Sequence, residues 1–313
     1  MEFLTTCRIT ERNSNRRIDL FLSREFGYLS RSEWQREILR GKISYNGGLL
    51  TKYDRKTRTG DVITYAGRDA VEPEVDATYS VIYEDDCLLA VNKPGNLPVH
   101  PAGVFYHNTL QSILQKEYDT KLHLLHRLDR ETSGVIILAK NAATASAIHD
   151  TFSSVEKTYI ALVHGVPEHD VFMNDMPIGF DAASGIEHKR IAHENAPEAA
   201  CTKFIRIKSK NDLTLLKAVP YTGRQHQIRV HLKHAGYPIV GDKLYGRDET
   251  VFRDFIKTGP TGEIERKLGF KRCALHSRSI TFYHPSLQKK ICIRAPLHED
   301  MRKYINNQWG TDV

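Results

Sequence analysis

The first part of the chain contains two short runs in which apolar residues recur at helical spacing. The first run covers residues 18–26. Ser30 and Glu33 have the spacing of a capping box that would begin a second helix, and Gly41 is a residue type that ends one. The residues predicted to face inward from this second helix are Trp34, Ile38 and Leu39. Two short consecutive helices are therefore expected.

Strand signals follow these helices directly. Residues 43–45 are strand-like, Asn46-Gly47 is a strong hairpin signal, and residues 61–65 have the pattern of a closing strand. Together with the helices they predict a compact α+β module over residues 16–65. The next stretch, residues 66–78, is polar, acidic and contains proline, so it is predicted to be a linker.

Strands and helices alternate after the linker. Helices are predicted behind the capping residues Thr109 and Asn141, and strands are predicted at 79–83, 87–91, 135–140, 157–164, 201–207 and 213–219. Residues 170–199 are polar and weakly patterned, which predicts loops or a small hairpin. This arrangement indicates an α+β fold with a second, larger domain.

Composition narrows the class of protein. The chain has 313 residues, of which 40% are hydrophobic and 27% charged, as in ordinary globular proteins. It has no apolar run near the roughly 18 residues that span a bilayer, and the first residues do not resemble a secretory signal. Its five cysteines, with no Cys-x-x-Cys, predict neither a disulfide framework nor a zinc site, and Cys87 and Cys292 are predicted to be small buried side chains. A cytoplasmic protein without membrane contact is expected.

The positive charge is concentrated near the N-terminus. Residues 8–60 carry 13 basic and six acidic residues, an excess equal to the net charge of +7 of the whole chain. On the polar side of the second predicted helix lie Arg31, Arg36 and Arg40. A module that grips a phosphate backbone is charged in this way, although a solvated surface explains the charge equally well.

Asp129 is the most informative candidate for chemistry. It lies between Arg127 and Arg130, directly before the apolar run at 135–139. An aspartate at such a junction often serves only to form a turn. The flanking arginines favour a second interpretation, because they would keep the carboxylate ionised and attract a polyanion.

A second basic cluster is predicted to form a helix. Thr222 and Gln225 have the spacing of a capping box, and Gly236 would end the helix. Helical spacing turns one apolar face inward and places Gln225, His226 and Arg229 on a different face. Arg229 could then reach a neighbouring site, while the alternative is a basic amphipathic helix with a solvated face. The histidine spacings do not match the His-Glu-x-x-His zinc motif.

Segments of this chain resemble two known families. The N-terminal module is similar to the S4 RNA-binding domain, in Arg17-Ile18-Asp19, Ser30-Arg31-Ser32, Arg40-Gly41-Lys42-Ile43 and Asn46-Gly47. From about Tyr79 to Pro296 the chain resembles the RluA family of RNA pseudouridine synthases. The segments that carry this resemblance, in order, are residues 92–101, 126–135, 157–165, 222–232, 241–246 and 274–277.

The resemblance implies a fold and a domain division. The fold is α+β: a pseudouridine synthase catalytic domain with a mixed, mostly antiparallel sheet over residues 79–313, and a small α+β S4-like domain over residues 1–70. Lys93 and His100 belong to a proline-containing loop that we interpret as architectural. This loop departs from the commoner family pattern at Gly95-Asn96 and Pro98, and this departure, together with residues 103–109, favours a member outside the large-subunit rRNA subgroup.

The resemblance also implies roles for individual residues. Asp129 matches the catalytic aspartate, Arg229 its ion-pair partner, and Tyr159 the aromatic residue that packs on the flipped uracil. Arg127 matches the side chain that fills the vacancy in the RNA, and Leu275 the pocket wall. The alternatives are a phosphate contact for Arg127, a core position for Tyr159 and Leu275, and a surface cation for Arg229. Arg31, Arg36 and Arg40 are the expected RNA contacts of the S4-like domain.

These observations predict an isomerase that converts uridine in structured RNA, tRNA or rRNA, to pseudouridine by base flipping and an aspartate-dependent mechanism. The resemblance implies no cofactor and no metal, and we expect a monomer. One alternative is a non-catalytic protein that binds or folds RNA. Another is a nucleoside hydrolase or glycosidase, which would need a second carboxylate to activate water, with Glu131 as the nearest candidate.

Overall fold

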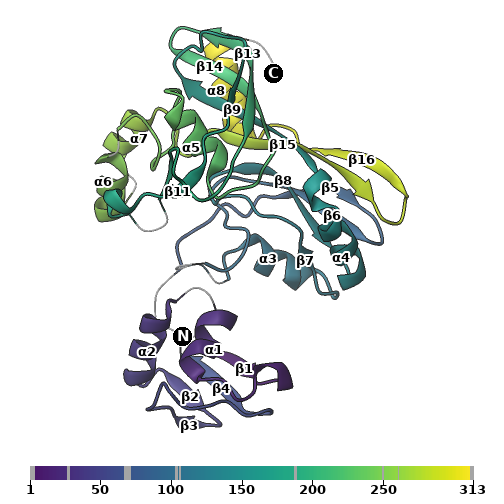
Figure 1. Ribbon diagram of the computed structural model, residues 1–313, viewed down its shortest axis with the longest axis vertical. Helices are drawn as coiled ribbons and strands as arrows, with labels where there is room; N and C mark the ends of the chain where they lie inside the picture. Colours follow the sequence, from purple (N-terminus) through teal and green to yellow (C-terminus); the bar gives the residue numbers. More distant parts are fainter. Residues whose placement is uncertain are drawn as a thin grey trace. The chain divides into compact units, whose positions relative to one another are not determined.

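The chain forms two compact units. A computed structural model describes residues 4–26, 29–66, 72–102, 105, 107–186, 189–248, 250–259 and 261–310. One unit comprises Met1–Val75 with His100–Ile113, and the other comprises Asp76–Val99 with Leu114–Val313 (Figure 1). Part of the predicted linker, residues 67–71, lies outside the described residues.

The N-terminal unit is a four-stranded antiparallel sheet with two helices. The strand order is β1-β4-β2-β3 (Figure 1). Its elements are β1 (Leu4–Arg8), η1 (Glu11–Asn13), α1 (Ile18–Glu25), α2 (Arg31–Leu39), β2 (Ile43–Tyr45), β3 (Gly48–Leu49) and β4 (Val62–Ala66). This is the small α+β architecture expected of an S4-like domain.

Local signals in this unit are confirmed. The Ser30 side chain accepts a hydrogen bond from the Glu33 backbone, and the Glu33 carboxylate accepts one from the Ser30 backbone, so the capping box forms. Asn46 and Gly47 both have positive φ, as the tight turn between β2 and β3 requires. The inward orientation of Leu39 is wrong, because this residue is 66% exposed. It follows Ile38 and therefore points about 100° away around the helix.

The second unit is built on a ten-stranded, mixed and mostly antiparallel sheet. The main path has the order β10-β13-β14-β9-β15-β8-β6-β5, with β16 beside β15 and β7 beside β8 (Figure 1). The strands are β5 (Ser80–Glu84), β6 (Leu88–Lys93), β7 (His123–Leu124), β8 (Ser133–Ala139), β9 (Glu156–His164), β10 (Val171–Asn174), β13 (Thr202–Lys210), β14 (Leu213–Pro220), β15 (Leu275–His284) and β16 (Lys289–Arg294). The predicted fold class is confirmed.

A parallel pairing joins the two halves of this sheet. His276 on β15 pairs with Ser133 on β8, and Ser277 pairs with Gly134. Gly134 has a φ of +112°, and a Cβ atom there would lie 2.2 Å from the Ser277 carbonyl oxygen. Only glycine fits this close approach. The loop that enters β8, which carries Asp129, is therefore anchored at the middle of the sheet.

The remaining helices and a small two-stranded sheet complete the architecture. The Asn141 cap is confirmed, since its side chain accepts a hydrogen bond from the Thr144 backbone. Residues 170–199 contain the expected small hairpin, β11 with β12, but also β10, which the polar pattern did not predict. The remaining elements are α3 (Leu110–Glu117), α4 (Ala142–Asp150), η2 (Phe152–Ser154), β11 (Ile178–Phe180), η3 (Ala182–Ser184), β12 (Arg190–Ala192), α5 (Gln227–His234), α6 (Thr250–Thr258), α7 (Gly262–Leu268) and α8 (Glu299–Trp309).

Two predictions made from the composition can be compared with the structure. Within the described ranges, no helix has the length and apolar character needed to cross a membrane. All five cysteines are free thiols, and Cys292 is exposed, so its predicted burial is wrong. Its side chain points outward from β16, a strand in which buried and exposed positions alternate.

Candidate active site

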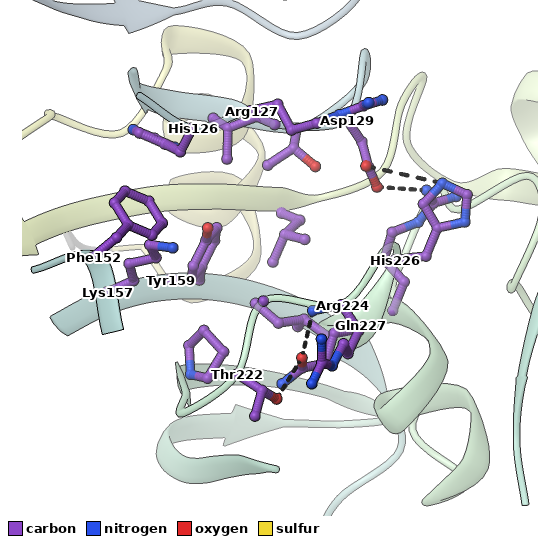
Figure 2. Close-up of a pocket in the computed structure, with 17 residues that line it drawn as sticks. His126, Arg127, Asp129, Phe152, Lys157, Tyr159, Thr222, Arg224, His226 and Gln227 are labelled. Atoms are coloured by element: carbon purple, nitrogen blue, oxygen red, sulfur yellow. Dashed lines mark hydrogen bonds and ion pairs between the residues drawn. The ribbon is translucent and has the colours of Figure 1, made fainter. Parts of the chain in front are cut away.

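Asp129 faces a cavity of about 270 Å³ in the second unit. Five segments line it: the loop before β8, η2, the start of β9, the segment from the end of β14 into α5, and the start of β15 (Figure 2). Of the residues predicted for the site, Asp129, Arg127, Tyr159, Arg229 and Leu275 all line this cavity. The fold thus brings together side chains that are up to 148 positions apart in the sequence.

Arg229 binds two carboxylates at once. Its Nη1 donates to Oδ2 of Asp129 at 2.7 Å. Its Nε and Nη2 donate to the two oxygens of Asp242 at 2.7 and 2.9 Å. The Asp242 side chain is fully buried, whereas that of Asp129 is 27% exposed. Asp242 therefore fixes the guanidinium, and the guanidinium presents its remaining edge to Asp129.

The sequence did not assign Asp242 a role. It lies within the 241–246 segment of the resemblance, and its Oδ1 also accepts hydrogen bonds from the Leu244 and Tyr245 backbones, each at 3.0 Å. An aspartate two and three residues before its amide partners is a recognisable turn signal. That local signal gave no indication of the contact with Arg229.

The electrostatics of this group favour ionised Asp129. Burial alone would raise the pKa of Asp129, but the Arg229 guanidinium outweighs burial and lowers that pKa below its ordinary value. Burial acts in the same direction on Asp242, and Arg229 with two backbone amides lowers the pKa of Asp242 to about 2. Two carboxylates and one arginine thus carry a net negative charge at neutral pH.

The predicted capping box of Thr222 and Gln225 does not form. Helix α5 begins after His226, which has a left-handed φ of +58°. The Thr222 hydroxyl instead donates to Oε1 of Gln227 at 2.7 Å and accepts from the Cys201 backbone at 3.0 Å. This tertiary contact with the start of β13 overrides the local pattern, while the predicted helix end is confirmed by the positive φ of Gly236.

Tyr159 and Leu275 line the cavity from neighbouring strands. Both side chains are largely buried, at 9% and 4% exposed. Burial raises the pKa of the Tyr159 phenol to about 12, so its hydroxyl stays protonated. Arg127 is exposed at the cavity, and Figure 2 shows it between His126 and Asp129.

Two further cavity residues lacked an assigned role. Lys157 lies on β9 two positions before Tyr159, and its Nζ is 4.4 Å from the centre of the Phe152 ring. Burial lowers the pKa of Lys157. His126 Nε2 accepts a hydrogen bond from the Ile137 backbone at 3.2 Å, and burial lowers the His126 pKa to about 3, so this imidazole is neutral. Both residues belong to quoted segments of the resemblance, which was the available signal.

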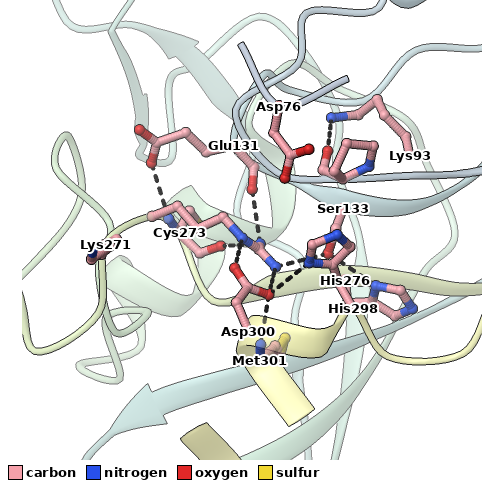
Figure 3. A network of polar contacts seen from close by, with 12 residues as sticks. Asp76, Lys93, Glu131, Ser133, Lys271, Cys273, His276, His298, Asp300 and Met301 are labelled. Atoms are coloured by element: carbon pink, nitrogen blue, oxygen red, sulfur yellow. Dashed lines mark hydrogen bonds and ion pairs between the residues drawn. The ribbon is translucent and has the colours of Figure 1, made fainter. Parts of the chain in front are cut away.

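A polar network outside the cavity holds the loop that carries Asp129 (Figure 3). Glu131 accepts hydrogen bonds from Lys243 Nζ at 2.6 Å and from the Cys273 backbone at 3.0 Å. Arg272 donates to the Glu131 carbonyl and forms two hydrogen bonds with Asp300 on α8. Glu131 is therefore used in positioning the loop, and it does not line the cavity.

The loop at 92–101 contacts the same region. The fully buried Lys93 Nζ donates to three carbonyl oxygens, those of Pro94, Leu97 and Arg130, at 2.8, 2.8 and 3.1 Å. A Cβ atom on Gly95 would lie 2.1 Å from Arg272 Cδ, so a glycine is needed there. These contacts support the architectural interpretation of Lys93.

The three arginines predicted for the S4-like domain lie in the N-terminal unit. Arg31, Arg36 and Arg40 are all exposed on α2. Arg31 Nε contacts the buried Asp19 at 3.0 Å, and Arg40 Nη1 contacts Glu37 at 2.9 Å. In the described part of the chain, no cluster of three His, Cys, Asp or Glu side chains is arranged to hold a metal ion.

Known proteins are similar to this chain in sequence and fold. Residues 87–234 match the RNA pseudouridylate synthase family. A ribosomal large subunit pseudouridine synthase C from Buchnera aphidicola subsp. Acyrthosiphon pisum (strain APS) is 32% identical over 307 residues, which cover 93% of each chain. A protein of Bacillus subtilis (strain 168) named uncharacterized RNA pseudouridine synthase YlyB is 31% identical over 312 residues, covering 95% of this chain and 96% of that protein.

The fold comparison agrees with the sequence. The structure of human RNA pseudouridylate synthase domain containing 4 has a TM-score of 0.57 at 25% identity, and the match covers 75% of this chain and 94% of the human chain. With relatives above 30% identity along nearly the whole chain, this protein belongs to the RluA family of RNA pseudouridine synthases, which are isomerases.

Proposed function

We propose that this enzyme isomerises uridines in structured RNA with Asp129 as its catalytic carboxylate. The observation that carries the proposal is the ion pair of Asp129 with Arg229 at the wall of a cavity, at 2.7 Å. The carboxylate is charged and partly exposed, so one of its oxygens can reach a bound nucleotide.

The chemistry requires little more than this carboxylate. The bond between N1 of uracil and C1′ of the ribose breaks, the base turns, and a bond forms between C5 and C1′. The hydrogen on C5 leaves as a proton and N1 gains one, so atoms and electrons balance without an oxidant or reductant. A carboxylate that acts as a nucleophile or stabilises charge at C1′ is sufficient.

The cavity walls suit a flipped uracil. Tyr159 offers a flat aromatic face, and Leu275 offers an apolar wall. Arg127 is exposed beside Asp129, where a planar guanidinium can occupy the place that the base leaves in the RNA. Extruding a base costs a few kcal/mol, which these contacts would offset.

We propose large-subunit rRNA as the substrate. The Buchnera relative and several others at 29–32% identity carry the name ribosomal large subunit pseudouridine synthase C. These names weigh against the expectation drawn from Gly95-Asn96 and Pro98. The presence of Gly95 is explained by packing, because this glycine accommodates the Arg272 side chain.

We further propose that the N-terminal unit captures the RNA through the exposed face of α2. Arg31, Arg36 and Arg40 extend from this face. The buried Asp19 holds Arg17 and Arg31 by hydrogen bonds of 3.0–3.1 Å, which orders two cations before RNA arrives. Phosphate contacts by ordered arginines supply affinity that does not depend on sequence.

The rival activities find less support. A glycosidase needs a second carboxylate at the substrate, and Glu131 is paired with Lys243 behind the loop. A protein that only binds or folds RNA has no use for a charged carboxylate in the cavity, because this charge repels phosphate.

The test is to map pseudouridines in rRNA and tRNA from cells with and without this gene. Loss of a pseudouridine in large-subunit rRNA, restored by the wild-type gene and not by an Asp129→Asn gene, is the expected result. Loss confined to tRNA would reassign the substrate. An unchanged map, or release of free uracil by the purified enzyme, would overturn the proposed reaction.

A further inference from the structure

His226 lies where it can act on Asp129 from the side opposite the ion pair. Arg229 binds Oδ2 of Asp129, and the His226 Nε2 atom faces Oδ1 at 3.9 Å. Figure 2 shows the imidazole beside the carboxylate at the wall of the cavity. The two contacts thus address different oxygens of the same carboxylate.

The hydrogen-bond partner of Nδ1 determines which ring nitrogen of His226 carries the hydrogen. The hydroxyl of Tyr245 accepts a hydrogen bond from the Arg190 backbone at 2.9 Å, and it lies 2.9 Å from Nδ1 of His226. Among the described residues, Nδ1 is the acceptor within reach of the Tyr245 hydroxyl hydrogen. The phenol therefore donates to Nδ1, and a neutral imidazole must carry its hydrogen on Nε2.

The charged and titratable groups around His226 are Asp129, Arg229, Asp242, Arg190 and Tyr245. Burial lowers the pKa of His226 to about 4, and this outweighs the opposing effect of Asp129. Burial also raises the pKa of Tyr245, so the phenol keeps its hydrogen. Both groups are thus neutral near pH 7, as the tautomer assignment requires.

The backbone at His226 is in an unusual conformation. It has a φ of +58° directly before α5, in the left-handed region that few residues other than glycine adopt, asparagine, aspartate and histidine more often than the rest. This conformation places the His226 ring against Tyr245, with ring centres 5.6 Å apart. The strained backbone therefore turns the imidazole toward the Asp129 carboxylate.

We propose that His226, held as the Nε2–H tautomer by the Tyr245 hydroxyl, is a positioning residue that fixes the second oxygen of Asp129 for reaction. With Arg229 alone, the Asp129 carboxylate is held at one oxygen and can rotate about its Cβ–Cγ bond. A donor at Oδ1 removes that freedom. The 3.9 Å separation shortens to a hydrogen bond when the nucleotide fills the cavity, as contacts in active sites do on binding.

This inference rests on the proposed function of Asp129, and a matched pair of variants tests it. Glutamine places an amide N–H near the position of Nε2, whereas asparagine places one near Nδ1 and tolerates the left-handed backbone better. RNA labelled with tritium at C5 of uridine, taken from cells lacking the gene, releases tritium to water at each isomerisation. With enzyme in excess, this measures the rate of the bound complex separately from RNA affinity.

The expected result is a rate about 100-fold lower for His226→Asn and within about tenfold of wild type for His226→Gln, with RNA affinity unchanged for both. Equal rates for the two variants, whether both normal or both impaired, would overturn the proposal. If Asp129→Asn itself retained its rate, the proposed function would fail instead, so the two failures are distinguishable.

A second measurement tests the tautomer of His226 directly in the wild-type enzyme. Nitrogen-15 spectra of histidine side chains distinguish protonated from unprotonated ring nitrogens, and the signal missing in His226→Gln assigns His226. A protonated Nε2 in the wild type, with a mixture of tautomers in Tyr245→Phe, is expected. A protonated Nδ1 in the wild type would overturn the proposal.

Discussion

Asp129 and Asp242 bind the same guanidinium, yet their surroundings differ in one decisive way. Asp242 is fully buried and accepts hydrogen bonds from Arg229 and from the backbones of Leu244 and Tyr245. The side chain of Asp129 accepts a hydrogen bond from Arg229 and is 27% exposed to the cavity. A carboxylate whose oxygens are saturated is structural, whereas one left partly unsaturated beside a cavity is available for chemistry.

The N-terminal unit extends the comparison. Asp19 is buried and accepts hydrogen bonds from Arg17, Arg31, Gln35 and the Leu20 backbone. It resembles Asp242 in saturation and differs from Asp129. The same pair of residue types, aspartate and arginine, thus orders a surface in one unit and forms part of the proposed active site in the other.

The largest stability difference is expected between alanine variants of the two carboxylates that share Arg229. Asp242→Ala removes two hydrogen bonds from a buried guanidinium and should lower the free energy of unfolding by about 3 kcal/mol. Asp129→Ala leaves the Asp242 pair intact and should cost less than about 1 kcal/mol. Urea denaturation of both variants measures this difference. Equal losses would show that Asp129 is as structural as Asp242.

Acid unfolding sharpens the same contrast. The pKa of Asp242 in the folded enzyme is about 2, below the ordinary value near 4 in the unfolded chain. A lowered folded-state pKa stabilises the fold above pH 4, and this stability is lost as the pH falls toward 2. Asp242 should contribute about 2–3 kcal/mol to that loss. Unfolding free energies of wild type and Asp242→Asn between pH 5 and pH 2 should converge, and parallel curves would contradict the assignment.

Replacing Asp19, which holds Arg17 and Arg31, should lower the free energy of unfolding less than replacing Asp242. It should also lower the affinity for RNA. Asp19→Asn weakens the charge-assisted contacts with the half-buried Arg17, the exposed Arg31 and Gln35, and should destabilise the N-terminal unit by about 1–2 kcal/mol. RNA affinity should fall with it, because Arg17 and Arg31 lose their fixed geometry. The rate of isomerisation in the bound complex should not change. A lower rate at saturating enzyme would show that Asp19 acts beyond RNA capture.

The dependence of RNA affinity on salt concentration separates RNA binding by α2 from catalysis, and it is the smallest of the expected effects. Replacing Arg31, Arg36 and Arg40 together by glutamine should reduce the slope of log affinity against log salt by about two to three. Replacing the exposed Lys289 and Lys290 on β16 by glutamine is the matched control and should leave the slope unchanged. An unaltered slope in the triple variant would remove α2 from RNA binding.

Sequence patterns predicted the parts of the fold that depend on neighbouring residues. The Ser30 capping box and the Asn46-Gly47 turn formed as expected, because their hydrogen bonds and dihedral angles are set within four residues. The Thr222 capping box failed because a hydroxyl that can cap a helix can also bind another strand, here at Cys201. Strand β10 was missed because it is a four-residue edge strand within a polar stretch, and its apolar residues Val171 and Met173 are exposed whereas its buried position carries Asn174.

The candidate active site was also predicted only in part from the sequence. The family resemblance placed Asp129, Tyr159 and Arg229 in one site, and all three line the cavity. It left Asp242 and His226 without roles, since the first acts through a contact 13 positions away and the second depends on a left-handed backbone and a phenol 19 positions away. Neither relation leaves a periodic signal in the sequence.

The most direct test of the account compares Asp129→Asn with wild type in RNA binding and in tritium release from C5 of uridine. Asparagine keeps the size of the side chain and removes its charge. We predict that isomerisation falls by at least about 10⁴-fold while RNA binds with wild-type affinity. Retained isomerisation, or a loss fully explained by weaker RNA binding, would contradict the claim that this carboxylate performs the reaction.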